Sequence, residues 1–272
     1  MKVMARGNIL KLKSHYIDDT RPVAYSLPVG DEDLPFNDLI GKTIRLHFTG
    51  QINCIATREK IKKSYNQGYS YKASISLARC DLCIVKPELC HYHKGTCREP
   101  QWGEKHCMIP HYIYLSISSH LKVGITRHTQ IPTRWVDQGA VEGLCILKVK
   151  DRLTSGLIEK EIAQDFSDRT NWRAMLKGDV KSVDLFALRD QIYEDYGDIF
   201  DEYDAEDVDG ELYKIVYPFD HKNLKKLKSL SLDKVSTIES QLLGIKGQYL
   251  ILEQGVLNMR KHQGYWVEVS CS

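Results

Sequence analysis

The sequence lacks the long apolar runs that are typical of membrane and secreted proteins. No stretch of its 272 residues approaches a membrane span, and the N-terminal MKVMARGNILKLK has no apolar core of signal-peptide length. A formal net charge of +2 excludes a basic field over the whole surface. These absences predict a cytoplasmic protein with no membrane partner, and they leave its oligomeric state open.

Several well-known site motifs are also missing. The sequence contains no P-loop, no dinucleotide-binding fingerprint and no nucleophile elbow. Residues 194–211 are strongly acidic but lack the pattern of a calcium loop, so we interpret them as a solvated face. Residues 54–79 are rich in lysine and tyrosine. They are interpreted as a solvated hairpin, with a nucleic-acid surface as the alternative.

The cysteines are not evenly spread: five of the eight lie between Cys80 and Cys107. The cytosol keeps thiols reduced, so this clustering favours a metal over disulfides. Cys80 and Cys83 form a C-x-x-C pair, and Cys90 and His93 repeat the spacing, which suits Zn²⁺. The candidate ligands exceed the four that one structural zinc site uses, which leaves the tetrad open: Cys80, Cys83, Cys90, His93, Cys97 and Cys107.

Hydrophobic patterning predicts an α+β fold. The two ends of the chain are β-rich, and we expect residues 3–12, 23–27 and 40–48 to share one sheet or barrel with residues 244–252, 255–260 and 264–269. The centre reads as strands over 112–116 and 121–126, a helix over 133–138 and a strand over 143–149. A helix over 155–166, capped by Thr154 or Ser155, and another starting near Thr170 complete a ββαβαα unit.

This order of elements predicts five regions along the chain. They are a β-rich domain over 1–79, a zinc-binding segment over 80–110, an α/β unit over 111–178, a helical and acidic connector over 179–235, and a β segment over 236–272 that packs on the first domain.

The stretch from His111 to Arg134 gathers tyrosine, lysine, threonine and arginine at one edge of a predicted hairpin. This composition predicts a phosphate-handling site, with Glu159 further along the chain. Simpler interpretations exist for each residue: Tyr114 as a core side chain, Glu159 paired with Lys160 or Arg152, and Arg134 paired with Asp137 or Asp168.

Two resemblances follow from these residues. Residues 86–104, 122–140, 168–178 and 244–261 resemble a bacterial family of unknown function, domain-of-unknown-function family 2797. Residues 112–163 resemble the GIY-YIG endonuclease superfamily. Tyr112-Ile113-Tyr114 stands at the GIY position, and Lys122-Val123-Gly124 stands at the YIG position. Arg134 lies on the first predicted helix, and Glu159 lies on the helix that follows the third strand.

The GIY-YIG resemblance implies a role for each residue. Tyr114 would position or deprotonate water, Arg134 would bind the scissile phosphate, and Glu159 would hold a divalent ion, Mg²⁺ or Mn²⁺. Lys122 replaces the second tyrosine, and lysine binds phosphate but is a poor base at its ordinary pKa. Further phosphate contacts are expected from Gly124, Thr126 and Arg127.

The resulting expectation is a zinc-stabilised nucleic-acid-binding protein that acts as a divalent-metal-dependent nuclease on DNA or RNA. The alternatives are a non-catalytic DNA- or RNA-binding module, and a nucleic-acid modification enzyme that uses the same cleft.

Overall fold

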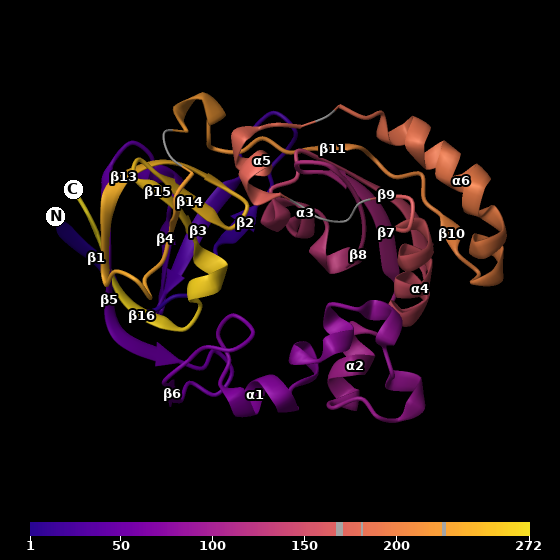
Figure 1. The fold of residues 1–272 in the computed structure, drawn as a ribbon, viewed down its shortest axis with the longest axis horizontal. Coiled ribbons are helices and arrows are strands. Elements are labelled where there is room, and N and C mark those ends of the chain that lie inside the picture. Colours follow the sequence, from indigo (N-terminus) through magenta and orange to yellow (C-terminus); the bar gives the residue numbers. More distant parts are fainter. Residues whose placement is uncertain (167–170, 181, 225–226) are drawn as a thin grey trace. The chain divides into compact units, whose positions relative to one another are not determined.

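The computed structural model describes residues 1–166, 171–180, 182–224 and 227–272, which form an α+β protein (Figure 1). The chain divides into two compact units. Unit 1 comprises Met1–Ile75 and Ile215–Ser272, and unit 2 comprises Ser76–Lys214. None of the helices in the described ranges combines the length and the apolar character that a membrane crossing requires.

The main sheet of unit 1 is built from both ends of the chain. Its strands lie in the order β1 (Lys2–Asn8), β16 (Tyr265–Cys271), β5 (Thr43–Asn53), β13 (Thr237–Lys246), β14 (Tyr249–Leu252), β15 (Gly255–Asn258) and β12 (Ser229–Leu230), with β6 (Lys60–Ile61) paired to β5. Lys2 lies opposite Cys271, so both termini lie on this sheet (Figure 1). The prediction that the terminal segments share one sheet is confirmed for residues 3–8 and 43–48 and for the C-terminal strands, but it is wrong for residues 23–27, because β3 (Ala24–Val29) pairs with strands of a separate sheet. In the described residues the sheet is open, with β1 and β12 at its ends.

A second, three-stranded sheet completes unit 1, formed by β2 (Lys13–His15), β3 (Ala24–Val29) and β4 (Glu32–Pro35). One predicted strand, over 244–252, is wrong. The chain turns back within it, so that Lys246 of β13 pairs with Tyr249 of β14. Gly247 has a φ of +60°, which glycine adopts without steric cost, and this allows the tight turn.

Unit 2 contains the predicted ββαβαα order. Its sheet has the order β10 (Glu206–Asp207), β9 (Glu142–Val149), β7 (His111–Ile117) and β8 (Leu121–Arg127), with β11 (Tyr213–Lys214) also paired to β9. The helices are α3 (Thr133–Gln138) between β8 and β9, then α4 (Arg152–Ile162), α5 (Trp172–Lys177) and α6 (Leu185–Glu202). The strand β8 is therefore an edge strand of this sheet.

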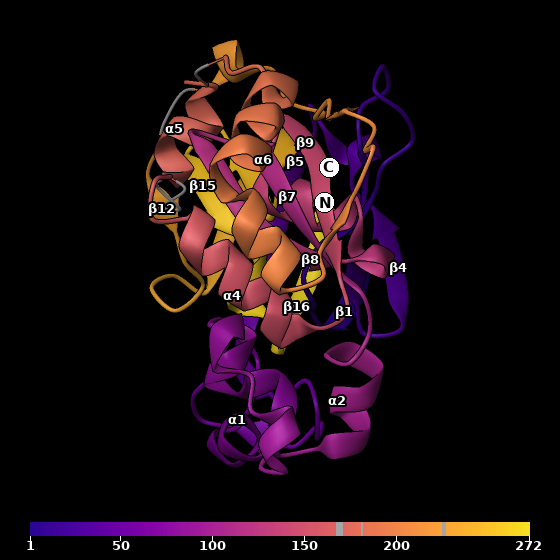
Figure 2. The ribbon, with the colours of Figure 1, turned by 90° about the vertical axis from the view of Figure 1, so that its right-hand side faces the viewer.

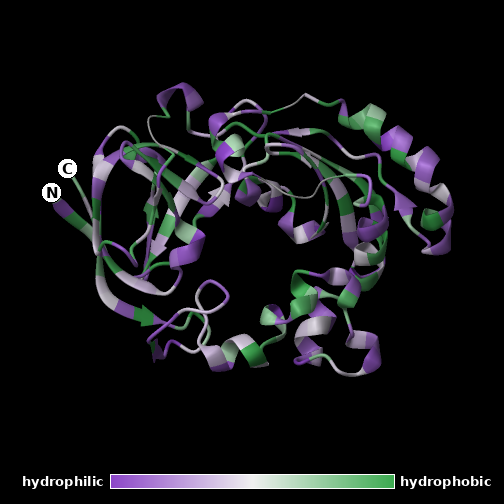
Figure 3. Cartoon of the chain, viewed as in Figure 1, coloured by the Kyte–Doolittle hydropathy of each residue, from purple (hydrophilic) through white to green (hydrophobic). Residues whose placement is uncertain are grey.

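The core of unit 2 lies between the sheet and the helices α4 and α6. Ile113 and Leu115 of β7 belong to the same buried cluster as Ile158 of α4 and Ile192 of α6. Figure 2 shows α4 and α6 in front of the strands, and Figure 3 shows hydrophobic and hydrophilic residues alternating along α6. Side chains alternate between the faces of a strand, so Tyr114 points to the opposite face. There it lies against Trp135 of α3, with ring centroids 5.6 Å apart.

The helix boundaries differ from those predicted. The helix α4 begins at Arg152 rather than Ser155, because Asp151 is its N-cap and accepts a hydrogen bond of 2.8 Å from the Thr154 backbone N–H. Thr154 and Ser155 are thus inside the helix. The predicted helix start at Thr170 lies outside the described residues, and the described helix α5 begins at Trp172 with Asn171 as its N-cap.

The cysteine-rich region of unit 2 is irregular. We call residues 80–107 the cysteine segment. Short 3₁₀ helices lead into it and run through it, at Ala78–Cys80 (η2), Leu82–Ile84 (η3), Pro87–Leu89 (η4) and Tyr92–Lys94 (η5), and the α-helix α2 (Pro100–His106) closes it. The remaining α-helix, α1 (Tyr71–Ser76), precedes it. The short helices bury few apolar side chains, so the segment has little hydrophobic core of its own.

Candidate functional site

Tyr114 and Gly124 face each other in the register of β7 and β8. The Tyr114 side chain is fully buried, and a Cβ atom added at Gly124 would lie 2.7 Å from both its Cζ and its hydroxyl oxygen. Such a distance is too short for any real contact. Position 124 therefore has no side chain because the tyrosine ring occupies that space, whereas sequence reasoning had linked this glycine to phosphate.

The Tyr114 hydroxyl lies among polar groups of α3. It donates a 3.2 Å hydrogen bond to Oε1 of Gln138 and accepts one from Arg134. Burial raises the pKa of Tyr114, and the positive charge of Arg134 acts in the opposite direction. Tyr114 therefore contacts Arg134 through its hydroxyl group and stays protonated at neutral pH.

Glu159 is the carboxylate of this region. Burial raises the pKa of Glu159 to about 7, although the charges of Lys122, Arg134 and Arg152 act to lower it. Lys122 lies opposite Ser116 on the edge strand β8, two residues from Gly124, and so is a diagonal neighbour of Tyr114. The helix α3 packs on the face of the sheet that carries Tyr114, and α4 packs on the face that carries Ile113. The charge of Arg134 on α3 nevertheless acts on Glu159 of α4.

Two arginines, Arg134 and Arg152, act on the Glu159 carboxyl group, and both also act on Arg127. Arg127, Arg134 and Arg152 repel one another, and burial together with this repulsion lowers the pKa of Arg127. Among the described residues, the ion pairs within 4.0 Å include neither Arg127 nor Arg134. In this part of the chain Arg134 thus has no ion pair with Asp137, and Asp168 lies outside the described residues.

We call Tyr114, Lys122, Arg127, Arg134 and Glu159 the charged site. A half-buried guanidinium near other guanidiniums is electrostatically unfavourable unless an anion is bound. Thr126, the other predicted phosphate ligand, is buried, and its hydroxyl donates to the Arg127 carbonyl at 3.3 Å. The charged site can therefore accept an anion through Arg134 together with Arg127 or Lys122, which lie at opposite ends of β8.

The cysteine segment encloses a second candidate site. A cavity of about 10 Å³ is lined by four of the six predicted ligands, namely Cys83, Cys90, Cys97 and Cys107, together with Asp81 and His91. This volume suits one water-sized particle. The residues that line it include neither Cys80 nor His93.

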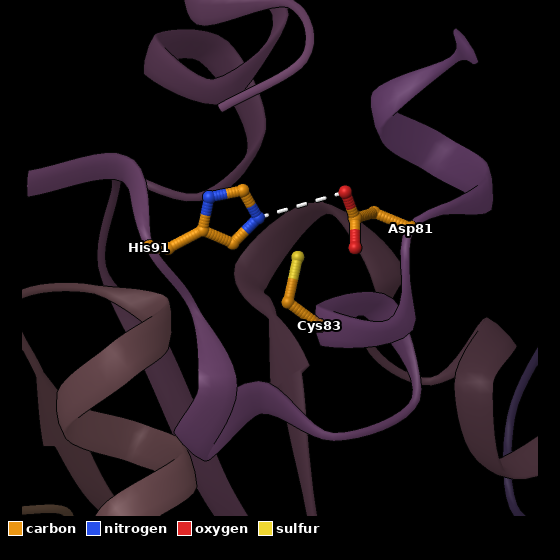
Figure 4. Close-up of side chains that lie close together, drawn as sticks. All are labelled: Asp81, Cys83 and His91. Atoms are coloured by element: carbon orange, nitrogen blue, oxygen red, sulfur yellow. Dashed lines mark ion pairs between the residues drawn. The ribbon is translucent and has the colours of Figure 1, made fainter. Parts of the chain in front are cut away.

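Side chains that can ligate a metal line this cavity, and three of them have ligand atoms that lie close together. The ligand atoms of Asp81, Cys83 and His91 lie within 4.8 Å of one another. Figure 4 shows the three side chains close together. The other thiols that line the cavity are those of Cys90, Cys97 and Cys107. Cys107 donates a hydrogen bond to the Cys90 sulfur, which lowers the pKa of Cys90 to about 6 and raises that of Cys107. This part of unit 2 is a possible metal-binding cluster.

Asp81 and His91 are also engaged with neighbouring side chains. Asp81 forms an ion pair of 2.7 Å with Arg98, and the His91 ring lies 2.7 Å from the Thr96 hydroxyl through Nδ1. Burial and the charge of Asp81 raise the pKa of Cys83 to about 11. Sequence reasoning missed Asp81, although its position inside the Cys80–Cys83 pair was a usable signal.

The described residues thus define an α+β protein that combines an arginine-rich charged site with a cysteine-lined cluster. The model of the family described as "Protein of unknown function (DUF2797)" matches residues 41–267, and the chain belongs to this family. This result confirms the first of the two resemblances. No curated protein and no solved structure matches the chain.

Proposed function

We propose that this protein binds nucleic acid at the charged site and hydrolyses its phosphodiester bonds in a divalent-metal-dependent reaction. The observation that carries the proposal is the excess of cations around Glu159. The charges of Lys122, Arg134 and Arg152 act on Glu159, and Arg127, at the other end of β8 from Lys122, acts on Arg134 and Arg152. Within the described chain, Arg127 and Arg134 have no ion pair. Guanidinium groups match the geometry of phosphate oxygens, so a phosphodiester is the natural anion for this site.

The order of elements supports a GIY-YIG-like site. Tyr114 lies on the first strand of the hairpin and Gly124 on the second, Arg134 lies on the following helix, and Glu159 lies on the helix after the third strand. In this proposal Arg134 and Arg127 bind the phosphate, and Lys122 adds a third cation. Tyr114 orients Arg134 through its hydroxyl group.

Glu159 would hold Mg²⁺ or Mn²⁺ together with oxygens of the bound phosphate. Magnesium commonly binds through one carboxylate and substrate phosphates, so a single glutamate is a suitable donor. When bound, such an ion would neutralise charge that develops on the phosphate. Glu159 must lose its proton for this role, and its pKa of about 7 makes that loss dependent on pH near neutrality.

For the cysteine segment we propose a structural zinc ion. The four thiols of Cys83, Cys90, Cys97 and Cys107 line one cavity, and thiolate is a donor that zinc prefers. Asp81 and His91 would surround the site, because Arg98 and Thr96 already contact them. Zinc there would order a segment that has few buried apolar residues.

Glu159→Ala separates binding from cleavage. Fluorescence anisotropy with labelled single- and double-stranded DNA and RNA should show that the variant binds at least as tightly as the wild type, because the carboxylate that repels phosphate is gone. Cleavage of the same oligonucleotides in Mg²⁺ or Mn²⁺ should be lost in Glu159→Ala. Glu161→Ala is the matched control, because this carboxylate lies on the same helix and contacts Gln164. Equal cleavage by wild type and Glu159→Ala would refute the nuclease proposal.

A non-catalytic binding module is the second candidate, and the burial of Tyr114 favours it. This side chain is 0% exposed and its pKa is raised, so it cannot act as a base without a rearrangement. Lys122 stands at the other tyrosine position. Binding without any metal-dependent cleavage, and loss of binding in Arg134→Met, would support this second function.

A further inference from the structure

The N-terminal end of α4 is attached to the cysteine segment by one arginine. Arg152 Nε donates a 3.2 Å hydrogen bond to the carbonyl of Cys83, and its Nη2 donates one of 2.6 Å to the carbonyl of Ile84. The backbone N–H of Arg152 donates to the Cys107 carbonyl at 2.9 Å. A single residue thus joins the first turn of α4 to both ends of the cysteine segment.

The next residues of α4 extend this contact. Leu153 packs against the buried cluster of Cys83, Cys90 and Cys107. A Cβ atom added at Gly156 would lie 2.4 Å from the backbone nitrogen of Glu88 and 2.5 Å from the carbonyl carbon of Pro87. At Gly156 the backbone of α4 therefore packs directly against the backbone of Pro87 and Glu88, and this contact fixes the position of α4 along the cysteine segment.

Glu159 is three residues beyond Gly156, one helical turn further on the same side of α4. Its carboxyl group is influenced by Glu88 of the cysteine segment as well as by Lys122 and Arg134 of the charged site. The position of Glu159 thus depends on how α4 packs against η4. The helix η4 belongs to the cysteine segment, which consists largely of short 3₁₀ helices and whose buried cluster is made of cysteine side chains.

We propose that Arg152 is a positioning residue through which metal bound by the cysteine segment holds Glu159 in the charged site. This inference rests on the proposed function and adds a means of regulation to it. When thiolates bind a metal, the carbonyls of Cys83, Ile84 and Cys107 are fixed, and they hold the start of α4. When the metal is removed, those acceptors move, the first turn of α4 loosens, and Glu159 leaves Lys122 and Arg134.

Hydrogen–deuterium exchange tests this link without relying on catalysis. Zinc-loaded Arg152→Met protein should keep the zinc content of the wild type, while the amides of residues 155–162 exchange about tenfold faster, a loss of local protection that leaves unit 1 unchanged. Arg189→Met is the matched control, because this arginine lies on α6 and pairs with Asp190 at 2.7 Å. It should leave exchange in α4 unchanged.

Removing zinc from the wild type with a chelator is the second arm, and it covers the case in which Arg152→Met does not fold. Chelation should accelerate exchange in the cysteine segment and in α4 together, and added Zn²⁺ should restore protection. Unchanged exchange in α4, after either the substitution or chelation, would overturn the inference. Wild-type protein that contains no metal after preparation with zinc would overturn it as well.

The two proposals can fail separately. If the wild type does not bind or cleave oligonucleotides, the proposed function fails while the exchange measurement still decides the link. If binding and cleavage occur but are insensitive to chelation of zinc and to Arg152→Met, the link fails alone. Gly156→Ala tests the second contact, since the added methyl group must lift α4 from Pro87 and Glu88, and it should accelerate the same amides.

Discussion

The ring of Tyr114 occupies the place where a side chain at position 124 would be, so Tyr114 and Gly124 form one structural pair across β7 and β8. This pair also helps to position Arg134 in the charged site, because the Tyr114 hydroxyl contacts Arg134 and Gln138. A substitution at Gly124 must therefore displace Tyr114 and so alter the contact between Tyr114 and Arg134.

Gly124→Ala should destabilise unit 2 by about 1–3 kcal/mol, the usual cost of an extra methyl group in a full core. It should also weaken binding of phosphate-containing ligands, because Tyr114 must move away from Arg134. Urea unfolding and anisotropy measure the two effects. Gly197→Ala in α6 is the control: nothing lies within 4 Å of the added Cβ, so it should be neutral or stabilising by up to about 1 kcal/mol. Wild-type stability in Gly124→Ala would contradict the pairing.

Arg127→Met should raise stability slightly or leave it unchanged, because it removes a half-buried charge near Arg134 and Arg152. The same substitution should reduce oligonucleotide affinity by about tenfold, the effect of losing one charged hydrogen bond. Thermal unfolding and anisotropy at fixed ionic strength provide the comparison. A variant that loses stability but keeps its affinity would show that Arg127 has a structural role.

Glu159 should make stability depend on pH. An ordinary glutamate ionises near 4.5, whereas burial raises the pKa of Glu159 to about 7, so the folded protein holds an extra proton between these values. Its contribution to the free energy of unfolding therefore falls as pH rises from 4.5 to 7, and is constant above that. Glu159→Gln should remove this component, and the variant should gain stability relative to wild type as the pH increases.

From the ionisation of Glu159 we expect opposite pH trends for oligonucleotide binding and for cleavage. Oligonucleotide binding should strengthen as pH falls through about 7, because protonated Glu159 no longer repels phosphate. Metal-dependent cleavage should increase as pH rises through that range. Affinity and rate profiles between pH 5 and 9, with Glu159→Gln as the comparison, check this prediction. Identical profiles for the two proteins would show that another group titrates.

Zinc should be present at about one ion per chain, as expected for a closed four-ligand site. Elemental analysis of metal-replete protein measures it. Cys90→Ser should lose the ion and lower the yield of folded protein, since metal binding contributes directly to folding. Cys271→Ser is the matched control, because this thiol lies on β16 in unit 1. Zinc retained in Cys90→Ser would exclude Cys90 as a ligand.

Local sequence determined a large part of this fold. Period-two alternation over residues 40–48 identified the first half of β5, and the helical spacing of apolar residues identified most of α4, because side-chain periodicity follows directly from backbone geometry. The family was also readable from long stretches of sequence, and the match to residues 41–267 confirms it. Local signals were weaker at boundaries: Asp151 competes with Thr154 and Ser155 as a cap, and only the formed helix shows which one is used.

Only tertiary structure decided which distant groups meet. Spacing alone gave six candidate metal ligands, and folding brings Cys83, Cys90, Cys97 and Cys107 to one cavity beside Asp81 and His91. In the same way, the raised pKa of Glu159 and the lowered pKa of Arg127 depend on burial and on charges from other elements. Residue type and spacing are local properties of the chain, whereas desolvation and electrostatic repulsion are set by neighbours that are distant in sequence.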